Sequence, residues 1–188
     1  MIPGPVQTED YARAVIRAGQ PYLSADEAER KVAARMDRQQ IFQRETGRPR
    51  LWEVIHEGAL RQMIGSPEIR RVQLDRLQAA SSSTEVLLQV LPFSAYDDPG
   101  TDGPIRIFEF ANAPATAYTE CNGGGMIVEA PDQVASLMTA MNLIRAAALS
   151  PRGSLPGRVL VRDTTQHGDG PVLSVSPSDW QRFTASIR

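Results

Sequence analysis

The sequence contains few of the residues on which site chemistry usually depends. Its 188 residues include one cysteine and two histidines. A single cysteine excludes an internal disulfide bond and predicts a cytoplasmic location. Cys121, His56 and His167 do not pair with one another at ligand spacings such as CxxC or HExxH. The sequence therefore predicts no metal site, and no motif in it implies a cofactor.

Several other features are also missing. The N-terminus lacks a charged-then-apolar leader, and no apolar run approaches the length of a membrane span, so no membrane association is expected. The net charge is -2, which gives no overall positive field toward nucleic acid. No GxSxG motif is present, and the triplet Gly123–Gly125 is not followed by the helix of a phosphate-binding loop. We expect a tight turn there.

The first third of the chain is predicted to be helical. Thr8 is a candidate N-cap for a helix over residues 9–17, and Ser24 with Glu27 has the spacing of a capping box. The helix after Ser24 is expected to continue to Glu45. Its moderate apolar stripe contains Ala28, Val32, Arg35, Met36, Gln39 and Ile41. Acidic residues alternate with its many arginines, which is typical of a salt-bridged solvent face.

The rest of the chain alternates between strand and helix patterns. Strands are predicted over residues 51–60, 84–93, 105–110, 115–121 and 126–130, and helices after Ser66 and from Pro131 to Leu149. A linker over residues 150–157 precedes a short ββα unit. The expected fold class is α+β, with N-terminal helices, a mostly antiparallel sheet of about five to seven strands, a long C-terminal packing helix and a small ββα tail. The expected domains are residues 1–155 and a tail of residues 156–188 that packs on them.

The best chemical candidate is the stretch WEVIHE. Because side chains alternate along a strand, Glu53 and Glu57 should share a face, while Trp52 and His56 face the other way. Two carboxylates on one face can raise each other's pKa, as proton transfer requires. Alternatively, His56 is a hydrogen-bonded packing residue beside Trp52.

Glutamates recur along the predicted strands, at Glu85, Glu109, Glu120 and Glu129. If several of them share a face, they line an acidic groove. Alternatively, each is solvated or meets one of the 19 arginines. The pattern alone leaves both interpretations open.

A longer series of motifs resembles a known family. The segments, in order, are PGPVQTEDYARAVIRAG, AARMDRQQIF, LWEVIHEGALRQMIGSPEIRRVQLDRL, EVLLQVLPFSAY, YTECNGGGMIVEAPDQV and LIRAAALSP. Over residues 3–155 they resemble the large domain of actinobacterial antitoxin-like helix-turn-helix transcriptional regulators. Glu57 and Glu120 fall on positions where the family pattern carries glutamate.

The tail resembles a different protein. VLVRDTTQHGDGPVLSVSPSDWQRF is similar to the C-terminal half of a small actinobacterial domain usually encoded beside such regulators and thought to be their partner. The resemblance implies a regulator–partner fusion with both components shortened. No helix-turn-helix precedes Pro3, so the DNA-binding role is not expected to carry over, and the family supplies no catalytic residues.

Three functional hypotheses follow. The first is a non-DNA-binding regulatory or protein-interaction module with a protein partner. The second is a regulator-derived enzyme or ligand carrier that uses an acidic pocket for small-molecule chemistry, for example in specialised metabolism. In that case Glu57, Glu53 and Glu120 are the acid–base candidates, and Trp52 and His56 shape the pocket wall if the strand is irregular. The third is a degenerate remnant with no role of its own.

Overall fold

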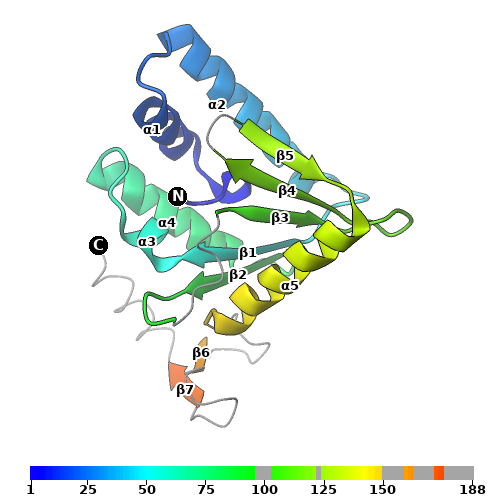
Figure 1. Cartoon of the computed structure of the whole chain (residues 1–188). Helices are drawn as coiled ribbons and strands as arrows, with labels where there is room; N and C mark the ends of the chain where they lie inside the picture. Colours follow the sequence, from blue (N-terminus) through cyan, green and yellow to red (C-terminus); the bar gives the residue numbers. More distant parts are fainter. Residues whose placement is uncertain (96–102, 122–123, 150–158, 163–171, 176–188) are drawn as a thin grey trace.

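The computed structural model describes residues 1–95, 103–121, 124–149, 159–162 and 172–175. Its fold class is α+β, as expected (Figure 1). In order, the elements are η1 (Gly4–Val6), α1 (Glu9–Gly19), α2 (Ala25–Gln39), η2 (Gln40–Gln43), β1 (Leu51–His56), α3 (Glu57–Arg61), α4 (Pro67–Ala80), β2 (Val86–Leu91), β3 (Ile105–Phe108), β4 (Thr116–Cys121), β5 (Gly124–Val128), α5 (Pro131–Ala147), β6 (Val159–Arg162) and β7 (Val172–Val175).

The predicted helix starts are confirmed by their caps. The Thr8 side chain accepts a hydrogen bond from the backbone N–H of Tyr11, and Ser24 with Glu27 forms a complete capping box. The Ser66 side chain accepts a hydrogen bond from the backbone N–H of Ile69 at the start of α4. These contacts use only neighbouring residues, so sequence spacing is enough to predict them.

Several predicted boundaries are wrong. The strand expected over residues 126–130 is β5 (Gly124–Val128), so Gly124 and Gly125 belong to a strand and not to the expected tight turn. Two further differences bear on the site. Helix α2 ends at Gln39 and continues as the 3-10 turn η2, rather than reaching Glu45. Strand β1 ends at His56, and the chain turns at once into α3, so the strand expected over residues 51–60 is cut short. The turn after β1 includes one hydrogen bond to a residue far along the chain, from the Phe93 backbone N–H to the Glu57 carboxylate, and a local pattern does not contain this contact.

The described strands form three sheets. β1 pairs with β2 in parallel, with Leu51 opposite Val86, whereas β3, β4 and β5 form an antiparallel meander. β6 and β7 form an antiparallel hairpin. The single sheet of about five to seven strands that the sequence predicted is therefore divided into three smaller sheets. The β1–β2 pair also departs from the expected antiparallel arrangement, because α3 and α4 provide the long crossover that parallel strands need.

Side chains on the two faces of β1 and β2 enter different parts of the core. Leu51, Ile55 and Val86 pack with the N-terminal segment and α4. Val54 and Ile105 pack instead with α5, which places β3 beside β1. In Figure 1 α5 crosses the strands on one side, and α1, α2 and α4 lie away from it. Strands β1 to β5 thus form a central layer between α5 and the N-terminal helices (Figure 1).

Two glutamines, the buried Gln73 and the half-buried Gln39, hold the N-terminal segment in this helical layer. The Gln73 side-chain amide donates to the Val6 carbonyl at 2.9 Å and its oxygen accepts from the Thr8 backbone N–H at 2.7 Å. The Gln39 amide donates to the carbonyls of Gly4 and Gln7 at 2.8 and 3.0 Å. These bonds satisfy backbone groups that would otherwise be buried without partners.

Several sequence expectations fall outside the described residues. They concern the linker over residues 150–157, the centre of the turn at residues 122–123 and the helix expected after Ser176. In the part of the chain that the structure describes, no helix is long and apolar enough to cross a bilayer.

Candidate functional site

Strand β1 divides the predicted site residues between two faces. The six residues of β1 pair with β2 without interruption, so the strand is regular. Glu53 shares the face of Leu51 and Ile55, which pack toward the N-terminal helical layer. Trp52 and His56 lie on the other face, the side of α5. Trp52 and His56 therefore do not form a pocket wall with Glu53, because that arrangement required an irregular strand.

Glu53 is the most perturbed carboxyl group in the described part of the chain. It is largely shielded from water, and desolvation raises its pKa from 4.5 to about 6. Arg106 on β3 opposes this shift because its positive charge favours the carboxylate. No hydrogen bond to the Glu53 side chain forms among the described residues. Glu53 therefore gains or loses its proton at a pH of about 6, closer to neutrality than an ordinary glutamate.

Arg106 belongs to a face of the meander that carries further polar groups. In the β3–β4 register Arg106 lies opposite Tyr118, and Glu120 follows two residues later on the same face. Helix α2 contributes Arg35. The charges of Arg106 and Glu120 both affect the pKa of Arg35. Four charged side chains from α2, β1, β3 and β4 are therefore electrostatically coupled. We call Arg35, Glu53, Arg106 and Glu120 the four-charge cluster.

Arg35 connects this cluster to the N-terminal segment. Desolvation lowers its pKa, the positive charges of Arg38 and Arg106 add to the effect, and Glu120 opposes it. One guanidinium nitrogen donates a hydrogen bond to the Gln7 side-chain oxygen at 3.0 Å. Gln7 is itself almost fully buried. Arg35 is thus held by a buried amide rather than by a carboxylate.

Glu57 is placed differently from the sequence expectation. It begins α3 instead of extending β1, so it does not share a strand face with Glu53. Its carboxylate accepts hydrogen bonds from the Phe93 backbone N–H at 2.8 Å and from Arg61 at 2.6 Å. Desolvation raises its pKa, but these two bonds outweigh that effect and hold the pKa below its usual value. Glu57 therefore links α3 to the end of β2 through the hydrogen bond that its carboxylate accepts from Phe93.

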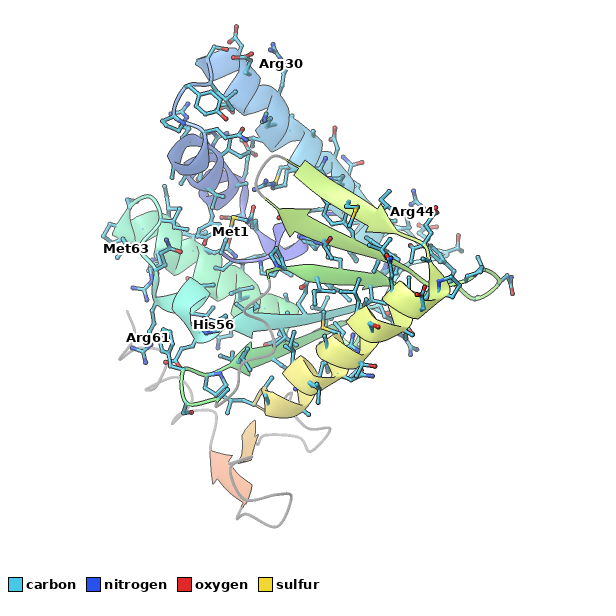
Figure 2. The ribbon with its side chains drawn as sticks, in the orientation of Figure 1. Met1, Arg30, Arg44, His56, Arg61 and Met63 are labelled. Carbon is cyan, nitrogen blue, oxygen red and sulfur yellow. The ribbon has the colours of Figure 1, made fainter. Side chains whose placement is uncertain are left out.

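His56 takes part in the same turn. Its Nδ1 accepts a hydrogen bond from the Gly58 backbone N–H at 3.0 Å, which caps α3. Its ring meets the Phe93 ring edge-on, with 5.2 Å between centroids, and the Arg61 guanidinium lies 6.0 Å from the same ring. Figure 2 shows His56 and Arg61 at the end of the molecule where α3 begins. The packing interpretation of His56 agrees with this geometry.

Trp52 fixes the C-terminal end of α5. The indole N–H donates to the Gln89 side-chain oxygen at 2.7 Å, and the Arg145 guanidinium lies 4.0 Å from the ring centroid. The Gln89 amide in turn donates to the carbonyls of Arg145 and Leu149. This network ties β1, β2 and the last turn of α5 together.

The expected acidic groove does not form as a row of strand carboxylates. Of the four recurring glutamates, only Glu120 is within a strand. The other three lie just outside β2, β3 and β5, at Glu85, Glu109 and Glu129. Among the residues that the structure describes, no group of three or more histidine, cysteine, aspartate or glutamate side chains could hold a metal ion. The cluster that does form is of mixed charge, with two arginines and two glutamates.

The two arginines of the cluster were not among the predicted site residues, although the sequence contains a signal for one. Arg35 falls on the apolar stripe of α2 with Val32 and Met36, and a charged residue there points toward the core. Arg106 stands between Ile105 and Ile107 and reads as an ordinary solvent-facing strand residue. Its closeness to Glu53 depends on the position of β3 beside β1.

These features describe an α+β domain with a mixed-charge cluster between its helical layer and its strands. Residues 1–156 match the model of a family described as "Domain of unknown function (DUF5753)", and the chain belongs to this family. No curated protein and no solved structure matches the chain.

Proposed function

We propose that this chain is a non-DNA-binding regulatory module of the antitoxin-like regulator type, and that it works by protein interaction. In this proposal residues 156–188 occupy a surface that related actinobacterial regulators keep for a separate partner. The family match ends at residue 156, so the tail lies beyond the family domain.

The observation that carries the proposal is the β6–β7 hairpin. Val159–Arg162 pairs with Val172–Val175 as a two-stranded sheet. An isolated two-stranded hairpin is at best marginally stable in water, so it needs a surface to pack on. The tail sequence also contains Trp180 and Phe183, and burial of each in the proposed interface would be worth about 3 kcal/mol or more. A binding surface on the family domain supplies the missing core.

Truncation after Ser154 tests this proposal. The shortened chain should aggregate or lose stability in urea, and a synthetic peptide of residues 156–188 should bind to it. The matched control is the same peptide with Trp180→Ala and Phe183→Ala, which should not bind. A soluble truncated monomer of unchanged stability that ignores the wild-type peptide would reject the fusion proposal.

The absence of DNA binding is tested separately. The net charge is -2, and basic residues in the N-terminal helices are balanced by acids, as in the ion pairs of Arg13 with Glu9, Asp10 and Glu29. Fluorescence anisotropy with fragments upstream of the gene should show no sequence-selective binding at physiological salt. Selective binding there would overturn this part of the proposal.

A ligand carrier or enzyme is the second candidate, and Glu53 is the observation that favours it. A shielded carboxyl group with a pKa of about 6 next to Arg106 can bind a polar small molecule or exchange a proton with it. A thermal-shift screen of amino acids and small organic amines tests this candidate. A true ligand should stabilise the wild type and not the Glu53→Gln variant, whereas ligands with equal effects on both proteins would count against it.

A further inference from the structure

The outer edge of strand β5 is open to pairing. β5 pairs with β4 on one side, and no other described strand pairs with it. Outside the sheet, the backbone groups of residues 125–128 make no hydrogen bond to the described residues. Helix α2 packs chiefly on α1 and η1 rather than along β5. Figure 1 shows β5 at the rim of the meander.

This edge lacks the usual protection against pairing. The strand reads Gly-Gly-Met-Ile-Val and contains no charged residue and no proline. Its two large central side chains are mostly exposed, Met126 at 58% and Ile127 at 69%. Natural sheets normally block such edges with lysine, proline or a bulge. A strand without these devices fits an edge that is covered by another strand.

We propose that the partner strand is β5 of a second copy of this chain, paired antiparallel about a twofold axis at Met126. In this register Met126 faces its own copy, Ile127 faces Gly125, and Val128 faces Gly124. Large side chains thus oppose glycines, so full overlap of the strand creates no crowding. Because β5 contains no charged residue, the pairing of the two strands places no like charges opposite each other. The pairing is isologous and closes at a dimer.

The Tyr118 ring lies over Gly125 and offers an apolar contact to a large side chain of the second copy. A Cβ placed on Gly125 would overlap the Tyr118 ring, so the ring lies across the strand at that glycine. In the proposed register Ile127 of the second copy sits beside Gly125 and covers the ring edge. An aliphatic side chain against an aromatic ring is a favourable cross-strand pair. The dimer therefore joins two meanders into one continuous six-stranded sheet.

This interface goes beyond the proposed function because it uses neither the tail nor the four-charge cluster. The experiment measures the mass of the full-length protein by sedimentation velocity over a range of concentrations. The wild type should show a monomer–dimer equilibrium. Met126→Lys and Met126→Glu each place like charges opposite one another across the axis, so each should weaken the dimer by about tenfold or more.

An equimolar mixture of the two Met126 variants provides the decisive test. Opposite charges then face each other at the axis, so the mixture should dimerise more strongly than either variant alone. Leu143→Lys is the matched control, because Leu143 is 57% exposed on α5 and is next to Ile144, which packs with Leu91 of β2 rather than with β5. It should leave the dimer unchanged. A wild type that stays monomeric, variants that dimerise like the wild type, or a mixture without recovery would each overturn the proposal.

Discussion

Replacing Glu53 by glutamine should stabilise the protein above about pH 6 and have little effect in acid. Desolvation raises the pKa of this carboxyl group to about 6, so the folded protein ionises it with difficulty. Glutamine has nearly the same shape as protonated glutamate but carries no charge at any pH. The substitution therefore removes the cost of ionisation and keeps most of the packing.

The size and direction of the effect follow from linkage between protonation and folding. Well below pH 4.5 the carboxyl group is protonated in both states and contributes nothing. Between pH 4.5 and about 6 the unfolded chain ionises first, so the folded state loses stability as the pH rises. Above this range the penalty is constant. A tenfold change in proton affinity corresponds to about 1.4 kcal/mol, so the full difference is about 2 kcal/mol.

Urea unfolding of the wild type and Glu53→Gln from pH 4 to pH 8 measures this difference. The free energies of unfolding should coincide at pH 4 and separate by about 2 kcal/mol at pH 8. Glu68→Gln is a suitable control, because a hydrogen bond from Arg71 lowers the pKa of that exposed carboxylate. A Glu53→Gln variant that is less stable than the wild type at pH 8 would refute the reasoning and assign Glu53 a structural ion pair.

Three further substitutions test other contacts by the same measurement. Glu57→Gln should cost about 1–3 kcal/mol at neutral pH, because its carboxylate accepts two hydrogen bonds, and the cost should shrink in acid because its pKa is low. Gln73→Ala should cost about 3 kcal/mol, because a fully buried amide holds two backbone groups. Gly125→Ala should cost about 1–3 kcal/mol, because a Cβ there overlaps Tyr118.

Each of these expectations has a result that contradicts it. A Glu57→Gln cost that grows as the pH falls would show that the carboxylate is not ionised in the folded state. A neutral Gln73→Ala would mean that the N-terminal segment is not held by this amide. For Gly125→Ala the comparison is Gly19→Ala, which meets no atom within 4 Å. Equal stabilities for these two alanine variants would argue against the packing of Tyr118.

The proposed dimer at the β5 edge and the proposed docking of the tail use different residues of this chain. Mutation of Met126 and removal of residues 156–188 should therefore act independently. A double variant in which the two effects do not add would show that the tail and the β5 edge are coupled.

The local features of the fold were predictable from the sequence. The caps at Thr8, Ser24 and Ser66 depend on residues within one helical turn, and each is present as predicted. The alternation along β1 also follows from neighbouring residues, so Glu53 was correctly separated from Trp52 and His56. Fold class follows from the order of such elements, since each apolar face must be buried against another.

Tertiary structure alone decided how the candidate residues meet. Glu57 was expected beside Glu53, but it begins α3, where its carboxylate accepts one hydrogen bond from Phe93, 36 residues away. Arg106 reaches Glu53 only because β3 lies beside β1, and Arg35 faces the same region only because α2 packs against the N-terminal segment. These contacts join residues far apart in sequence, and their energies depend on desolvation in the folded core. A local sequence pattern gives neither the distances between these residues nor the dielectric environment, and both determine the energies of the contacts.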